Sequence, residues 1–240
     1  MLFNRPDGQS NYLIMFLVLV GLFFVCFSFM REVAVFVIQP FFPGMSLKEI
    51  SEVLTEMPDD ILADRTSLFA IKVVSIMASI GGFVIAPVLY FKFFLKQKVG
   101  GTALDGFPKG ESTLLISLIF LCALPVAWWT GELNQQIVVS GTLGEFFDDL
   151  QLRTEKLNAA LLGSPYFSDF LTTILMTGVL AAFGEELFFR GALQKTLQDW
   201  SKNAYVAIGV TAFLFSAIHL QFYGFLPRFL MGILLGYVFY

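Results

Sequence analysis

The stretch NYLIMFLVLVGLFFVCFSFM occupies residues 11–30 and contains no charged side chain. About 20 such residues cross the hydrocarbon core of a bilayer as a helix, so we expect a membrane span here that extends toward Ile38. The apolar pattern stops at Gln39 and Pro40, where proline ends regular helical hydrogen bonding. The run is longer than the apolar core of a signal peptide and no small-residue cleavage site follows it, which predicts a retained helix.

The composition of the 240 residues extends this interpretation to the whole chain. Apolar residues make up 57%, charged residues only 14%, and the mean hydropathy is +0.76. Soluble domains carry about 25% charged residues, so a water-soluble enzyme is excluded. We expect an all-α fold, a polytopic transmembrane helical bundle that forms a single integral-membrane domain over residues 1–240.

Charge and cysteine content exclude two further classes of protein. The net charge is −4, and no basic tract is present that would neutralise a row of phosphates, so no nucleic-acid partner is expected. Cys26 and Cys122 lie in separate apolar runs. This arrangement is typical of buried thiols rather than of a disulfide or a metal pair.

Hydropathy predicts about six spans, of which the last is truncated. After the first, apolar runs occupy residues 67–94, 113–130, 169–189, 204–219 and 227–240. The polar segments 41–66 and 132–168 are expected at the membrane surface, each with an amphipathic helix, the second over residues 144–162. The run 227–240 has 14 residues, fewer than a span needs, so we expect the chain to continue past Tyr240 into further spans of a longer protein.

Basic residues predict the orientation of the spans. Lys and Arg are dense in two loops, residues 92–111 and 190–203, and sparse among the acidic residues of 31–66 and 132–168. Cytoplasmic loops carry the excess of Lys and Arg in membrane proteins. We therefore expect a cytoplasmic N-terminus in the cell membrane, inner or plasma.

The sequence GEELFFR at residues 184–190 is the leading functional candidate, because ionisable side chains inside membrane helices are costly. The adjacent carboxylates of Glu185 and Glu186 repel each other unless one of them is neutralised. Arg190 follows Glu186 by one helical turn, so we expect these two to pair and Glu185 to be left over. A Glu185 that simply emerges into water at the end of the span is the alternative interpretation.

The single histidine of the chain, His219, ends the apolar run 204–219, with Phe215 one turn before it on the same face. A lone histidine is more often a packing or interfacial residue than a catalyst, and that alternative stays open at this point. Simple span counting places Glu185 near the inner membrane face and His219 near the outer one. The two meet only if the helix that carries Glu185 is longer and continues to Leu197, which its apolar pattern permits.

Two motifs, Glu-Glu-x-x-x-Arg at residues 185–190 and Phe-x-x-x-His at residues 215–219, together resemble the CPBP family of intramembrane proteases, which includes CAAX prenyl proteases and bacteriocin-processing, Abi-type proteins. Both motifs match at every defining position, within a motif-bearing part at about 166–240. The family carries a third element on a later helix, a His followed four residues later by Asn. This chain has no second histidine, so we expect the motif-bearing part to be C-terminally incomplete and the chain to be inactive as it stands.

The resemblance implies an intramembrane endopeptidase that hydrolyses a peptide bond near the cytoplasmic membrane face. Its catalytic residues are then Glu185, Glu186, Arg190 and His219. Glu185 is the general base that activates a water, His219 orients that water, and Glu186 with Arg190 forms a supporting pair. The resemblance also allows a Zn²⁺ ion at Glu185 and His219, although a glutamate base requires no cofactor. The partners it implies are membrane lipid and a peptide or protein substrate with an apolar or lipidated segment.

Two other functions share these sequence features. A non-catalytic membrane scaffold or bacteriocin-immunity-type protein would keep the cluster only to brace a partner. A proton- or ion-coupled transporter would use the paired carboxylates as an ion path, but the absence of an internal repeat disfavours it. The substitution Glu185→Gln distinguishes a protease from a scaffold, because it removes the base and keeps the shape of the side chain.

Overall fold

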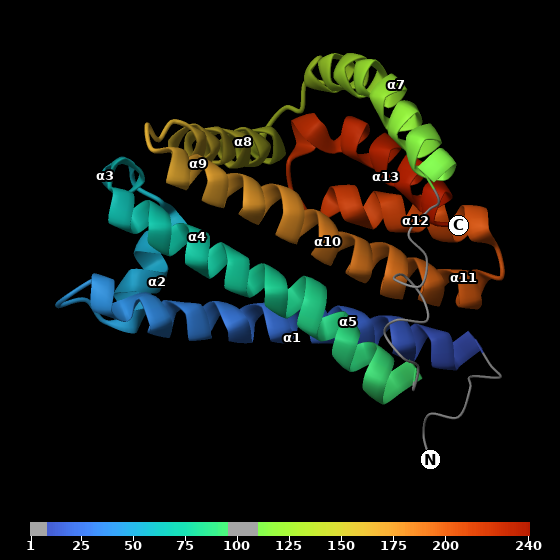
Figure 1. The fold of residues 1–240 in the computed structure, drawn as a ribbon, viewed down its shortest axis with the longest axis horizontal. Coiled ribbons are helices and arrows are strands. Elements are labelled where there is room, and N and C mark those ends of the chain that lie inside the picture. Colours follow the sequence, from blue (N-terminus) through green and yellow to red (C-terminus); the bar gives the residue numbers. More distant parts are fainter. Residues whose placement is uncertain (1–8, 96–109) are drawn as a thin grey trace. The chain divides into compact units, whose positions relative to one another are not determined.

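Helices account for all the regular secondary structure of this computed structural model, which describes residues 9–95 and 110–240 (Figure 1). No strand occurs in this described part, and the predicted all-α membrane fold is confirmed. The chain folds as two compact units built from segments far apart in the sequence. The first unit contains the described parts of Met1–Leu17 and Phe91–Gln151 together with Phe189–Tyr240, and the second contains Val18–Tyr90 and Leu152–Phe188. The single domain over residues 1–240 stays a prediction.

Four segments within residues 9–95 and 110–240 are long and apolar enough to cross a bilayer: Asn11–Phe41, Arg65–Leu95, Gly110–Gln135 and Phe222–Phe239. The helix Ala204–Ala217 is apolar but shorter. The last segment begins before the predicted start at Pro227, because proline fits the first turn of a helix, where its missing N–H removes no helical hydrogen bond. The chain is an integral membrane protein by these helices.

Two further predictions concern the cysteines and the basic loop that indicates the topology. Cys26 is buried, but Cys122 is exposed, so the prediction of a buried thiol is wrong for Cys122. Its helix is a candidate span, and the outer face of a span meets lipid, which accepts a thiol as well as a protein core does. In the basic loop used for the topology, Lys96, Lys98 and Lys109 lie outside the described residues, and the cytoplasmic N-terminus stays a prediction.

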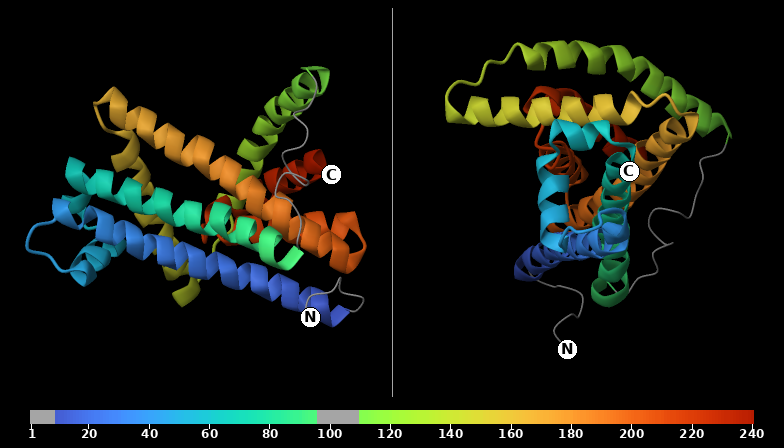
Figure 2. Two further views of the ribbon diagram at one scale, coloured as in Figure 1. Left: turned by 60° about the horizontal axis from the view of Figure 1, so that its bottom comes forward. Right: turned by 90° about the vertical axis from the view of Figure 1, so that its left-hand side faces the viewer.

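The second unit is built from two stretches of consecutive helices. They are α1 (Gln9–Ile38, from Val18 on), η1 (Gln39–Phe41), α2 (Leu47–Glu56), α3 (Asp59–Ala63), α4 (Arg65–Ser79), η2 (Ile80–Ile85), α5 (Ala86–Leu89), the end of α8 (Thr142–Leu162), α9 (Phe167–Ile174), η4 (Leu175–Leu180) and α10 (Ala181–Glu186). As predicted, α1 ends before Pro40, which lies in a single 3-10 turn. Figure 2 shows α1 and α4 side by side, and α2 caps their shared end with Ile50 and Leu54 buried in one apolar cluster with Ile71.

The first unit brings α7, α12 and α13 together. Its elements are the start of α1, most of η3 (Tyr90–Leu95), α7 (Gly110–Gln135), the start of α8, most of η5 (Leu187–Gln194), α11 (Lys195–Ser201), α12 (Ala204–Ala217), η6 (Phe222–Gly224) and α13 (Phe225–Phe239). α13 packs along α12 and also against α7. A Cβ on Gly232 of α13 would lie 3.1 Å from the Cβ of Ala212 in α12, so the glycine allows this close approach.

The helix that carries Glu185 is longer than the predicted span. It runs without a break from Phe167 to Ser201 through α9, η4, α10, η5 and α11. Of the two alternatives drawn from the sequence, the helix that continues past Leu197 is therefore the observed one. Its sections η4 and η5 are π-helical, a rare form that is frequent at functional sites.

Candidate functional site

The four predicted site residues are divided between the two units. Glu185 and Glu186 end α10 in the second unit, and both are half-buried. Arg190 lies in η5 and His219 follows the end of α12, both in the first unit.

Aromatic rings and a glycine pack the helix end that carries the two glutamates. A Cβ on Gly184 would lie 3.0 Å from the Cβ of Phe83 in η2, so the absence of a side chain lets α10 approach η2 closely. The ring of Phe188 lies 5.0 Å from that of Phe23 and 5.9 Å from that of Phe83, between ring centroids. Glu185 is thus next to a glycine that contacts another helix, on a helix end where Phe188 packs among other aromatic rings.

Arg190 is almost fully buried in the first unit, with 1% of its surface exposed. Its Nη2 donates a hydrogen bond to the carbonyl oxygen of Gly232 in α13, at 3.3 Å. Its guanidinium carbon lies 4.7 Å from the centre of the Phe215 ring, within the range of a cation–π interaction. The arginine of the first motif therefore contacts the phenylalanine of the second.

Phe215 also contacts His219, the other defining residue of its own motif. The two rings pack edge to face with centroids 5.2 Å apart, and Phe189 packs edge to face on Phe215 from η5 at the same distance. The His219 Nδ1 lies 2.8 Å from the carbonyl oxygen of Phe215. A carbonyl oxygen only accepts, so Nδ1 donates this bond, and in the neutral ring the lone pair is on Nε2. Arg190, Phe215 and His219 thus form one cluster, which we call the Phe215 cluster.

Gln194 and the glycines of α13 are site residues that the sequence reasoning missed. Gln194 is buried and donates from Nε2 to the carbonyl oxygen of Gly236 at 3.2 Å, as Arg190 does to Gly232 one turn earlier. Gly232 and Gly236 form a Gly-x-x-x-Gly pattern within an apolar run, a known signal of close helix packing. That signal predicts an exposed glycine face on α13, but it does not predict which side chains use it.

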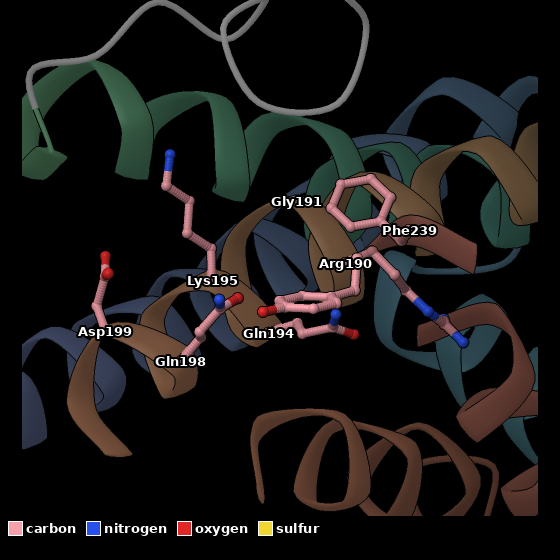
Figure 3. A pocket seen from close by; sticks show the side chains of 8 residues that line it. Arg190, Gly191, Gln194, Lys195, Gln198, Asp199 and Phe239 are labelled. Atoms are coloured by element: carbon pink, nitrogen blue, oxygen red, sulfur yellow. The ribbon is translucent and has the colours of Figure 1, made fainter. Parts of the chain in front are cut away.

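A pocket of about 320 Å³ opens beside this part of the first unit. It is lined by residues of η5 and α11, with Phe239 and Tyr240 of the α13 end. Figure 3 shows Arg190 and Gln194 in this lining, while the Lys195 and Asp199 side chains extend from another side of the same helix. The lining is mixed polar and apolar, and Arg190 and Gln194 are its most deeply buried polar side chains.

Two sequence predictions about these residues stay predictions. One is the ion pair between Glu186 and Arg190, and the other is the approach of Glu185 to His219. For a metal, no group of three or more His, Cys, Asp or Glu side chains in the described parts of the chain is arranged to hold an ion. The donors named from the sequence, Glu185 and His219, therefore do not by themselves make up a zinc site of the usual kind, which has three or four protein ligands.

Residues 167–240 match the model of a protein family described as Rce1-like, type II CAAX prenyl endopeptidase Rce1-like. The matched segment contains both motifs, from Glu185 to His219. The match confirms the resemblance to CAAX-type intramembrane proteases and supports endopeptidase activity of this type in general. No curated protein and no solved structure matches the chain.

Proposed function

We propose that this chain is an intramembrane endopeptidase of the CAAX type, the family matched by residues 167–240, and that it hydrolyses a peptide bond near the cytoplasmic membrane face. The observation that carries the proposal is the Phe215 cluster. In it the buried guanidinium of Arg190 lies over Phe215, whose carbonyl oxygen accepts from His219. The cluster joins residues of both motifs, from two consecutive parts of the chain that pack together in the first unit.

In the proposed mechanism Glu185 accepts a proton from a water molecule as that water attacks the carbonyl carbon of the scissile peptide. The C–N bond then breaks, and Glu185 returns the proton to the leaving amine. His219 orients the water through Nε2, because Nδ1 donates to Phe215. Glu186 and Arg190 support the site, and Arg190 contributes by holding Phe215 in place.

The proposed substrate is a peptide or protein whose cleavage site follows an apolar or prenylated segment, in contact with membrane lipid. Two features support this class of substrate. The family description names prenyl endopeptidases, and Glu185 lies in α10 directly after Gly184, which packs against Phe83 of η2. We also propose that the N-terminus is cytoplasmic, as the basic loops predict.

The mechanism assigns the proton transfers to Glu185 and the orientation of the water to His219, so it is written without a metal ion. A zinc requirement at Glu185 and His219 stays a separate prediction from the sequence. Treating the purified protein with 1,10-phenanthroline and then restoring Zn²⁺ tests it by measuring cleavage before and after.

The test of the proposed function is a cleavage assay in liposomes with the protein expressed from its complete reading frame. The substrates are internally quenched CAAX peptides with and without a farnesyl group. Removal of a general base or of the group that orients the water lowers rates by roughly a hundredfold or more. We expect such a loss of kcat/KM in Glu185→Gln and in His219→Gln. The matched control is Glu132→Gln, an exposed glutamate of α7, which should cleave like the wild type.

Wild-type rates in both Glu185→Gln and His219→Gln would exclude the proposed chemistry. A different outcome would indicate the scaffold or immunity-type function instead. In that outcome the wild-type protein cleaves neither peptide, and the wild type and the Glu185→Gln variant bind both peptides equally well.

A further inference from the structure

A sharp turn follows His219 in the first unit. Leu220 has a φ of 53°, in the left-handed region that a leucine side chain disfavours. The chain then passes through η6 into α13. Because strained backbone persists only where surrounding contacts determine it, the contacts of this turn decide where the His219 ring lies.

Ser216 closes the base of the turn. Its buried hydroxyl donates to the carbonyl oxygen of Phe225 at 2.7 Å, nine residues later. This bond joins the last turn of α12 to the first residue of α13. It leaves the residues between, including His219, as a short closed loop.

Asn134 of α7 holds the far side of the same loop. It is buried, with 2% of its surface exposed. Its Nδ2 donates to the carbonyl oxygen of Phe222 at 2.9 Å, and its Oδ1 accepts from the backbone N–H of Leu226 at 2.7 Å. One carboxamide thus pairs with backbone groups on both sides of η6, 88 and 92 residues away in the sequence.

We propose that Asn134 is a positioning residue for His219, an inference that rests on the proposed function. By binding Phe222 and Leu226 it fixes the exit of the turn, and Ser216 fixes its base. Without Asn134 the half-buried N–H of Leu226 loses its side-chain acceptor, and the carbonyl oxygen of Phe222 keeps only the N–H of Phe225. The turn then relaxes at the strained Leu220, and the adjacent His219 loses its defined orientation.

The experiment compares Asn134→Leu with Thr130→Val one turn earlier on α7. Leucine has roughly the size of asparagine but can make neither of the two hydrogen bonds. Thr130 is a matched control because it is also buried, but its hydroxyl bonds only to Val126 and Ala127 of its own helix. The first readout is kcat and KM for the farnesylated CAAX peptide. The second is the imidazole ¹H–¹⁵N NMR spectrum of ¹⁵N-histidine-labelled protein, in which His219 is assigned by its loss in His219→Gln.

We expect Asn134→Leu to lower kcat by roughly tenfold to a hundredfold, as a misplacement of about 1 Å does, with little change in KM. The His219 Nδ1–H signal should shift or broaden in this variant, because the ring leaves its bond to Phe215. Thr130→Val should match the wild type in both readouts. An unshifted His219 signal in folded Asn134→Leu overturns the proposal, whether or not cleavage falls.

If Asn134→Leu does not fold, Asn134→Asp decides instead, since it retains the acceptor for Leu226 and loses the donor to Phe222. An unshifted His219 signal in that variant counts equally against the proposal. The NMR readout needs no substrate, so it tests the position of His219 even if the wild type fails to cleave, which would refute the proposed function alone.

Discussion

Leu220 illustrates at the scale of a single residue how the site region stores strain. Its φ of 53° costs an L-residue about 1–2 kcal/mol, a cost from which glycine is exempt. Its side chain is 58% exposed, so its removal uncovers little buried surface. The left-handed backbone of Leu220 therefore lowers stability, while it also shapes the turn that follows His219.

Leu220→Gly should leave the free energy of unfolding unchanged or raise it by up to about 1 kcal/mol, because the strain is relieved. The matched control is Leu118→Gly in the middle of α7, where the leucine is 48% exposed and the backbone is helical. There the same substitution should lower stability by about 1 kcal/mol. Unfolding by SDS in mixed micelles measures both, and equal losses in the two variants would contradict the assignment of strain to Leu220.

Arg190 shows what residue-level reasoning could and could not anticipate. The sequence pointed to a buried charge that needs a partner, which follows from the cost of ionised groups in a membrane. It did not point to Gly232 or to the ring of Phe215, because a backbone carbonyl carries no residue-specific signal. Phe215 was singled out only for its place one turn before His219.

At the scale of the element, local hydrogen bonds set the helix ends. The side chain of Asn203 caps α12 by accepting from the N–H groups of Tyr205 and Val206. Asp169, the first residue of the predicted span 169–189, lies inside α9 and does not cap it. Tyr166 is the N-cap of α9, and Asp169 forms an ion pair with Arg65 of α4, 104 residues away.

Ser46→Ala should destabilise α2 by about 1 kcal/mol, because the hydroxyl of Ser46 accepts from the backbone N–H of Glu49 in a capping box. Ser51→Ala in the middle of the same helix is the control, and alanine's higher helix propensity should leave it neutral or slightly more stable. Hydrogen exchange of the α2 amides measures the difference. Equal protection in the two variants would show that the cap contributes nothing.

The same capping box makes the stability of α2 depend on pH. Hydrogen bonds from the backbone N–H and hydroxyl of Ser46 hold the pKa of Glu49 below its ordinary value of 4.5. Ionised Glu49 therefore stabilises the folded helix above that value, and the contribution is lost as the pH falls through the lowered pKa. The difference in α2 protection between wild type and Glu49→Gln should thus be present at pH 7 and vanish in acid.

At the scale of the whole molecule, segments far apart in sequence pack through residues that lack side chains. In the second unit a Cβ on Gly81 of η2 would collide with the carbonyl oxygen of Cys26 in α1 and lie 2.8 Å from the Cβ of Met30. A backbone atom cannot move aside as the end of a flexible side chain can. The contact between these two membrane helices therefore depends on a glycine at this position.

Gly81→Ala should lower the free energy of unfolding by about 1–3 kcal/mol, the usual cost of overpacking a tight core. Gly21→Ala on α1 is the control, because a Cβ there would meet nothing within 4 Å. It should be neutral or stabilising by up to about 1 kcal/mol through its gain in helix propensity. Unfolding in mixed micelles compares them, and a Gly81→Ala variant as stable as Gly21→Ala would refute this close packing.

The sequence by itself determined that this is a helical membrane protein, where α1 ends and that α2 is amphipathic. These properties depend on hydropathy and on hydrogen bonds within a turn of the residue concerned. Only the tertiary structure decided that Arg190 binds Gly232, that its guanidinium covers Phe215, and that Asn134 holds the turn after His219. Such contacts join residues distant in the sequence through backbone carbonyls and aromatic faces, which many positions offer equally, so only the packing of whole helices selects the partner.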